Sequence, residues 1–344
     1  MAKKADNDIW ISKANAWFEQ QGWSPFEFQE QTWEAFLEGK NGLLNAPTGS
    51  GKTFALWFPI LLHYLRKQGD SGESHPPGLK AVWITPLRAL SGEIRQSAQR
   101  IINDLGIPFT VGIRTGDTTQ SERVRQRKKM PDLLITTPES LQLLLASKGY
   151  DKAFGKCFAI VVDEWHELLG SKRGVQMELA LSRLKTVSPT LRVWGISATI
   201  GNLEQAREVL LGPGSKALSN SVLIRAHLKK RITVRSILPQ TMETFPWRGH
   251  LGLRLLDSVI DIIRTSQPTL IFTNTRPQCE IWSQKLLQRV PELAGELAMH
   301  HGSINKDTRM WVDQAIRDGR RRAVVCPSSL DLGVAFAPVE TVIQ

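Results

Sequence analysis

Short, continuously apolar runs rich in β-branched residues recur along the chain and alternate with longer segments of helical periodicity. Four clear runs cover residues 81–85, 133–137, 158–162 and 192–196. Their apolar positions are consecutive rather than alternating, which is typical of strands buried on both faces of a parallel sheet. Between them, residues 175–187 carry apolar side chains at the spacing of a helix face. Strands that alternate with helices predict an α/β fold with right-handed crossovers.

The pattern weakens at residues 219–250 and then resumes. The weak segment holds two prolines and a basic triplet, and it predicts an edge strand followed by a connector. Further apolar runs follow at residues 269–273, 297–300, 323–326 and 339–343. We therefore predict two parallel-sheet domains, at residues 1–225 and 249–344, with a connector at residues 226–248. Because the last run ends at Gln344, we expect the second domain to be cut short.

Composition narrows the class of protein. The 344 residues are 41% hydrophobic and 22% charged, which is typical of a folded chain. The sequence has no run of about eighteen uncharged apolar residues, so no membrane span is predicted. The N-terminus lacks the apolar core of a secretory signal. The three cysteines are far apart and fit neither a disulfide framework nor a metal knuckle. We expect a cytoplasmic protein with reduced thiols.

The charge balance favours a polyanionic partner. The 44 basic and 33 acidic residues give a net charge of +11, and nucleic acid is the commonest partner of such a chain. A merely basic surface is the alternative. Five basic side chains crowd into seven residues: Arg123, Arg125, Arg127, Lys128 and Lys129. This cluster is either a set of phosphate contacts or a solvated helix face. The same two interpretations apply to residues 229–231 and 320–322.

A glycine-rich loop provides the strongest chemical signal. Residues 43–45 predict a short strand, residues 54–66 predict a helix, and the loop between them includes Thr48, Gly49, Ser50, Gly51, Lys52 and Thr53. This strand–loop–helix context distinguishes a P-loop from a chance match. Small residues let backbone N–H groups converge on phosphate oxygens at a helix N-terminus. We expect Lys52 to reach the β- and γ-phosphates of ATP and Thr53 to hold Mg²⁺.

Two consecutive carboxylates follow the apolar run at residues 158–162. We expect Asp163 to orient Mg²⁺ and Glu164 to polarise the attacking water. A helix cap is the alternative interpretation of such a pair, and the upstream P-loop favours the catalytic one.

The tetrapeptide at residues 163–166 resembles the DExH box of superfamily 2 helicases. Other segments resemble that family's motifs in family order: residues 26–29 the Q-motif, 85–90 motif Ia, 136–141 motif Ib, 197–199 motif III, 271–276 motif IV, 300–303 the segment after it, and 328–334 motif V. Trp165 and the segments at 300–303 and 328–334 resemble the large helicase-related (Lhr) type. Within that type, the chain resembles bacterial ligase-associated DExH helicases of the DNA damage response.

The resemblance implies a fold, an activity and partners. It implies two RecA-like domains that use ATP and Mg²⁺ to move 3′-to-5′ along single-stranded DNA in DNA repair. The expected partners are single-stranded or partly duplex DNA and repair proteins such as a ligase or nuclease. The expected location is the cytoplasm, in association with the nucleoid.

The resemblance also assigns residues. It implies that Gln29 recognises adenine, that Gly333 lies at the ATP site, and that His166 couples hydrolysis to movement, although a structural histidine is the alternative. The implied nucleic-acid contacts are Pro86, Arg88, Thr137, Pro138, Thr273, Arg276, Ser328 and Ser329.

The chain departs from the family pattern in three places. Ala335 stands where the family usually has Asp, and Pro327 stands where Thr is common. Motif VI, whose arginines stabilise charge on the γ-phosphoryl group, is expected after residue 344. We therefore expect this chain to bind ATP better than it hydrolyses it.

An ATP-gated nucleic-acid clamp or adaptor with little turnover is one alternative function. An RNA remodeller is another, because motif order does not distinguish RNA from DNA.

Overall fold

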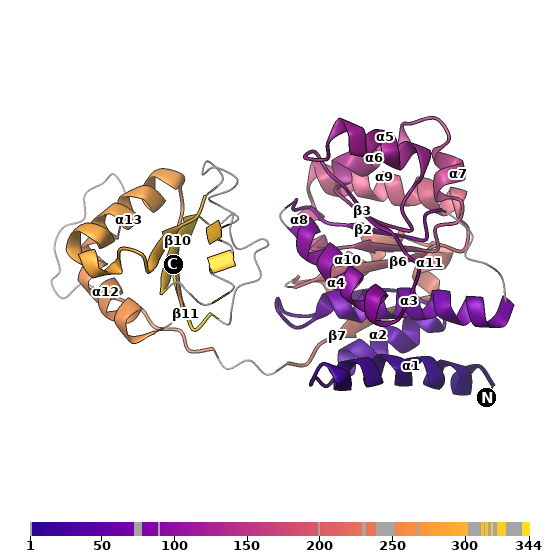
Figure 1. Ribbon diagram of the computed structural model, residues 1–344, viewed down its shortest axis with the longest axis horizontal. Coiled ribbons are helices and arrows are strands. Elements are labelled where there is room, and N and C mark those ends of the chain that lie inside the picture. Colours follow the sequence, from indigo (N-terminus) through magenta and orange to yellow (C-terminus); the bar gives the residue numbers. More distant parts are fainter. Residues whose placement is uncertain are drawn as a thin grey trace. The chain divides into compact units, whose positions relative to one another are not determined.

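The computed structural model describes residues 2–71, 78–88, 90–198, 200–228, 232–238, 252–266, 268–301, 311–312, 314–315, 318, 322–327 and 339–344, with the side chains of residues 2–6, 70 and 71 outside this description. The chain divides into two compact units, residues 1–229 and 230–344 (Figure 1). The division falls inside the segment predicted as a connector. Several predicted functional positions lie outside the described residues: Thr199, Ser328, Ser329, Gly333, Ala335 and the basic residues 229–231, 320 and 321.

Seven parallel strands form the sheet of the first unit, in the order β3-β4-β2-β5-β6-β1-β7. Their bounds are β1 Asn41–Asn45, β2 Ala81–Ile84, β3 Val111–Arg114, β4 Leu133–Thr136, β5 Ala159–Val162, β6 Arg192–Ser197 and β7 Ser221–Arg225. Strands β2, β4 and β5 are buried along their whole length. The parallel sheet predicted from continuous apolar runs is therefore confirmed.

Two separate cores hold helices against the two faces of this sheet (Figure 1). One core contains side chains of α1 Ala2–Gln20, α2 Glu27–Leu37, α3 Lys52–Ser71 and α4 Leu90–Asp104. The other contains side chains of α6 Pro138–Leu145, α7 Tyr150–Phe154, α8 Trp165–Leu168, α9 Lys172–Val187 and α10 Leu203–Leu211. Helices α5 Gln120–Lys128 and α11 Lys216–Ser219 complete the unit. The helices predicted at 54–66 and 175–187 lie within α3 and α9.

The alternation of side chains along each strand explains the two cores. In β2, Ala81 and Trp83 enter the core with α1–α4, whereas Val82 and Ile84 enter the other. Both faces of the central strands are covered, so their apolar residues form continuous runs rather than an alternating pattern.

The second unit contains a smaller parallel sheet. Its strand order is β11-β8-β10-β9, with β8 Thr269–Thr273, β9 Leu297–Met299, β10 Ala323–Pro327 and β11 Thr341–Ile343. Helices α12 Leu256–Thr265 and α13 Arg276–Arg289 pack on it, with the 3₁₀ turns η1 Leu253–Leu255 and η2 Pro291–Leu293. Among the helices that the structure describes in either unit, none is long and apolar enough to cross a membrane.

Candidate functional site

The P-loop lies between the end of β1 and the start of α3. Gly49 and Gly51 have φ angles of 78° and 80°, which side-chain-bearing L-residues rarely adopt. A Cβ atom on Gly51 would also lie 2.8 Å from Gln29 Nε2. The loop therefore needs glycine at both positions. Because α3 begins directly at Lys52, its free N–H groups and the positive end of its dipole form an anion-binding site at the loop.

Lys52 is a buried cation. Its side chain lies inside the first unit, with the residue 8% exposed, and Nζ has no hydrogen-bond partner among the described residues. The nearest opposite charge is Glu164 Oε1, at 3.7 Å. Burying a charge without close acceptors costs free energy unless another group completes its contacts. A phosphate oxygen is such an acceptor, so the unsatisfied ammonium group fits the predicted ATP site.

Asp163 stands at the carboxyl end of β5 and is held on three sides. Its N–H donates to the Ile84 carbonyl at 2.7 Å, Oδ1 accepts from the Glu164 N–H at 2.9 Å, and Oδ2 accepts from Trp83 Nε1 at 3.1 Å. Burial and the neighbouring Glu164 charge raise the pKa of Asp163, against the opposing effects of Lys52 and the Trp83 hydrogen bond. A nearby divalent cation would favour the ionised carboxylate, and oxygen donors are the ligands that Mg²⁺ prefers. Asp163 therefore fits the predicted metal-binding role.

Glu164 adopts a strained backbone conformation. It is the one non-glycine residue with positive φ in the described part of the chain, with φ 46° and ψ 47°. Such conformations cost free energy and occur preferentially at functional sites. The turn brings the Glu164 carboxylate to 3.7 Å from Lys52 Nζ and 3.4 Å from His166 Nδ1.

His166 connects this carboxylate to the end of a second strand. Its Nδ1 lies 3.3 Å from Ser197 Oγ, at the end of β6, and its Nε2 lies 3.6 Å from Glu167 Oε1. Asn45, at the end of β1, donates from Nδ2 to the carbonyls of Ser197 and Ala198. The P-loop strand, the DExH residues and the described part of motif III are thus joined side by side. We did not predict Asn45, although a polar residue at the end of a buried strand was the available signal.

Gln29 reaches the P-loop from α2. The buried amide accepts from the Phe26 N–H at 2.8 Å and donates to the Gly51 carbonyl at 3.0 Å. The structure therefore brings together Gln29, the P-loop residues 48–53, Asp163, Glu164 and His166, all in the first unit.

A second set of predicted residues lies at the carboxyl ends of β2 and β4, which are neighbours in the sheet. Pro86 and Arg88 follow β2, while Thr137 and Pro138 follow β4. Thr137 Oγ1 caps α6 by accepting from the Ser140 N–H at 3.4 Å, and Pro138 occupies the first turn. Of these four side chains, Arg88 alone is exposed. Arg88 is also paired with Asp117 at 3.1 Å, in the loop after β3.

Arg173 ties the two loops together and was not predicted. From the first turn of α9, its Nε donates to Glu139 Oε1 at 2.6 Å and its Nη2 donates to the Pro86 carbonyl at 2.9 Å. Nothing in the local sequence distinguishes this arginine from other surface arginines. We refer below to residues 85–88 and 115–119, in the loops after β2 and β3, and residues 137–139, at the start of α6 after β4, as the loop edge.

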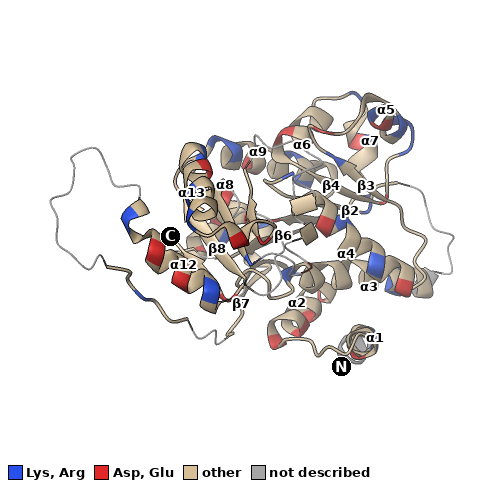
Figure 2. Ribbon diagram, turned by 60° about the vertical axis from the view of Figure 1, so that its left-hand side comes forward, with Lys and Arg blue, Asp and Glu red and all other residues tan. Residues whose placement is uncertain are grey.

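Helix α5 carries a cluster of basic residues (Figure 2). Its members make different contacts. Arg123 donates to the carbonyls of Thr115 and Gly116, both at 3.1 Å, so it supports the loop after β3. Arg125 pairs with Glu122 at 2.7 Å. Beneath the helix, Arg114 is buried, and its Nη1 has no hydrogen-bond partner among the described residues. The exposed cations are Arg125, Arg127, Lys128 and Lys129.

The second unit places the remaining described candidates at the end of β8. Thr273 Oγ1 donates to the Thr275 carbonyl at 3.2 Å, and Arg276 is exposed at the start of α13.

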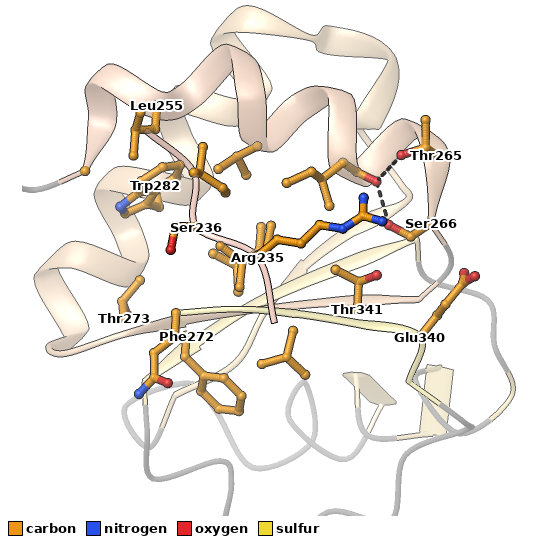
Figure 3. Close-up of a pocket in the computed structure, with 18 of the residues that line it drawn as sticks. Arg235, Ser236, Leu255, Thr265, Ser266, Phe272, Thr273, Trp282, Glu340 and Thr341 are labelled. Atoms are coloured by element: carbon orange, nitrogen blue, oxygen red, sulfur yellow. Dashed lines mark hydrogen bonds between the residues drawn. The ribbon is translucent and has the colours of Figure 1, made fainter. Parts of the chain in front are cut away.

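A pocket of about 930 Å³ in this unit includes Thr273, Arg235 and Trp282 in its wall (Figure 3). In its wall the hydroxyl groups of Thr265 and Ser266 both donate to the Ile262 carbonyl. The P-loop and DExH residues belong to the first unit and do not line this pocket.

Comparison with known proteins identifies the family to which the chain belongs. Residues 26–206 match the DEAD/DEAH box helicase family, and residues 254–344 match the helicase conserved C-terminal domain. The chain therefore belongs to the DEAD/DEAH box helicase family, and the predicted pair of RecA-like domains is confirmed.

The relatives are of the Lhr type. The chain is 30% identical to the ATP-dependent helicase Lhr-Core of Methanothermobacter thermautotrophicus, over 97% of this chain and 39% of the relative. It is 30% identical to the Lhr helicase/uracil glycosylase of Escherichia coli, over 98% and 25%. Its fold is similar to that of Mycobacterium smegmatis helicase Lhr bound to ssDNA and AMP-PNP, with a TM-score of 0.75, 29% identity and coverage of 99% and 43%.

The resemblance to Lhr-type helicases is thus confirmed. The chain spans between 25% and 39% of the length of these two curated relatives.

Proposed function

We propose that the chain is the motor part of an ATP-dependent helicase that moves 3′-to-5′ on single-stranded DNA. Within it, residues 1–225 form the ATP-binding domain, residues 249–344 belong to the C-terminal helicase domain, and residues 226–248 connect them. The main support is the buried Lys52 ammonium group, which has no hydrogen-bond partner in the described part of the chain and lies 3.7 Å from Glu164 at the end of a parallel sheet. The complex of the similar M. smegmatis helicase Lhr with ssDNA supports the choice of DNA.

The residues of the site divide the work on ATP. Lys52 and the N–H groups at the start of α3 bind the phosphates, while Gln29 holds the P-loop and recognises adenine. Thr53 and Asp163 hold Mg²⁺, which supplies neutralising charge to the phosphate oxygens. Glu164 orients the attacking water and accepts its proton. His166 contacts both the Glu164 carboxylate and the Ser197 hydroxyl, so it couples ATP hydrolysis at Glu164 to motif III.

The loop edge forms the DNA-binding part of the first unit. Its buried members Pro86, Thr137 and Pro138 shape the loops, whereas Arg88 and the exposed cations of α5 face solvent and contact phosphates. Phosphate contacts carry no sequence information, so the DNA sequence has little effect on affinity. The resemblance to ligase-associated helicases supports a role in DNA repair on the nucleoid, together with a ligase or nuclease.

ATP turnover with different nucleic acids tests this proposal. The rate of phosphate release is measured with no polymer, with single-stranded DNA and with single-stranded RNA of matched length. Because this chain is expected to bind ATP better than it hydrolyses it, the proposal predicts a slow turnover that DNA stimulates more than RNA and that is lost in Lys52→Ala. Binding of ATP and DNA without stimulated turnover would identify the ATP-gated clamp. Stronger stimulation by RNA would identify an RNA remodeller. Stimulated turnover that survives in Lys52→Ala would contradict the assignment of the ATP site.

A further inference from the structure

Trp83 is a buried residue of the sheet that donates a hydrogen bond to the proposed metal-binding carboxylate of Asp163. β2 and β5 are adjacent parallel strands, with Trp83 opposite Val161 and Ile84 opposite Val162. Asp163 follows Val162, so it lies two residues beyond Val161, and side chains two residues apart point to the same face of a strand. Trp83 is completely buried, and its Nε1 lies 3.1 Å from Asp163 Oδ2. A buried indole N–H normally finds an acceptor, and here that acceptor is the carboxylate.

The other side of Trp83 contacts the P-loop helix. Its ring stacks on that of Trp57 in α3, with centroids 4.7 Å apart and an angle of 29° between the ring planes. Trp57 lies five positions after Lys52, is equally buried, and has no hydrogen-bond partner for its own Nε1 among the described residues. Trp83 is thus clamped between the helix that starts at the phosphate-binding lysine and the carboxylate.

The two hydrogen bonds fix the rotation of the Asp163 carboxylate. Oδ1 accepts from the Glu164 N–H, and Oδ2 accepts from Trp83. A carboxylate has about four acceptor positions, so both oxygens keep capacity for a further ligand while their directions are set. The Glu164 N–H is a backbone donor whose position depends on the turn after β5, which leaves Trp83 as the side-chain donor that holds this group.

We propose that Trp83 is a positioning residue, which orients the Asp163 carboxylate for Mg²⁺ through the hydrogen bond from its indole N–H. The proposal rests on the proposed function, because it takes Asp163 as the metal ligand. Groups that hydrogen-bond metal ligands typically change metal affinity by about 10- to 100-fold when removed. Removal of the indole N–H therefore weakens the part of nucleotide binding that depends on Mg²⁺ and spares the part that depends on the P-loop.

The test compares Trp83→Phe with Trp57→Phe in the full chain. Both changes remove one buried indole from the same stacked pair, but only the first removes a hydrogen bond to Asp163. Calorimetry gives the dissociation constant of AMP-PNP in EDTA and in Mg²⁺, and the ratio of the two constants is the Mg²⁺ gain. We expect the gain to fall about tenfold or more in Trp83→Phe and to stay at the wild-type value in Trp57→Phe. Binding in EDTA is expected to remain unchanged in both variants.

A double-mutant cycle with Asp163→Asn separates positioning from damage to the pocket. If Trp83 acts through Asp163, adding Trp83→Phe to Asp163→Asn causes no further loss of gain. An unchanged gain in Trp83→Phe, or an equal loss in the Asp163→Asn background, overturns the proposal. An undiminished gain in Asp163→Asn, or no gain in the wild type, overturns the proposed metal site and this proposal with it. If thermal melting shows that Trp83→Phe is unfolded, Trp83→Met provides the same comparison with an adaptable apolar side chain.

Discussion

The ATP site and the loop edge lie in the same unit but differ in how completely their polar groups are satisfied. At the ATP site, Lys52 is buried with no hydrogen bond to any residue that the structure describes, and Glu164 has a strained backbone. At the loop edge, Thr137 caps a helix and Arg173 is bonded to both neighbouring loops. The first region keeps unsatisfied groups that a ligand would complete, at a cost in stability. The second is a rigid support for a few exposed cations.

The largest effect should come from Glu164→Gln. The change keeps the side-chain shape but removes the proton acceptor, so we expect DNA-stimulated turnover to fall by about 10²- to 10⁴-fold while AMP-PNP affinity remains. Glu167→Gln is the matched control, because Glu167 also contacts His166 but lies on the solvent side. Equal losses in both variants would mean that the effect passes through His166 rather than through the attacking water.

The exposed cations of α5 should have the next largest effect. Because Arg123 supports a loop, the sharper variant replaces Arg125, Arg127 and Lys128 by Ala. Each lost contact to single-stranded DNA lowers the slope of log affinity against log salt by about 0.7, so the triple variant should lose about 2. The control replaces three exposed lysines elsewhere in the first unit: Lys148, Lys152 and Lys156. The same loss of slope in the control would show that α5 is only a solvated basic face.

Arg173→Ala should weaken DNA binding more modestly. The change removes the hydrogen bonds from Arg173 to Glu139 and to the Pro86 carbonyl, so the two segments lose their common support. The exposed cations of α5 all remain. We expect DNA affinity to fall by several-fold with an unchanged salt slope. Arg183→Ala is the control, because Arg183 lies on the same helix and stacks on Tyr150 instead. A reduced slope in Arg173→Ala would make Arg173 itself a phosphate contact.

The smallest expected effect is a change in melting temperature when Asp163, a buried carboxyl group of the ATP site, is replaced. Because the pKa of Asp163 in the folded protein is raised to about 6, this carboxyl group supports folding when it is protonated at low pH. That contribution is lost as pH rises from about 4 to about 6. In EDTA, Asp163→Asn should therefore raise the melting temperature at pH 7.5 and have less effect at pH 4.5. A stabilisation of equal size at both pH values would contradict the raised pKa.

Strands, helices and loops whose structure depends on residues adjacent in the sequence could be predicted from the sequence. Strands β2, β4, β5 and β6 were predicted because each is a continuous apolar run, and the P-loop because its glycines adjoin a strand and a helix. Strand β3 was missed, since it is a half-buried edge strand interrupted by Gly112. The Trp83–Asp163 and Arg173–Pro86 contacts join residues 80 and 87 positions apart. Such contacts depend on strand order and register, which a local pattern does not contain.

We propose that Lys52 is held ready for the phosphates of ATP, and thermal stabilisation by ATP distinguishes this role from a purely structural one. The melting temperature of the full chain is measured with and without Mg²⁺-ATP, for the wild type and for Lys52→Ala. We expect ATP to stabilise the wild type, increasingly with concentration, and not to stabilise the variant. Equal stabilisation of both proteins by ATP would contradict it.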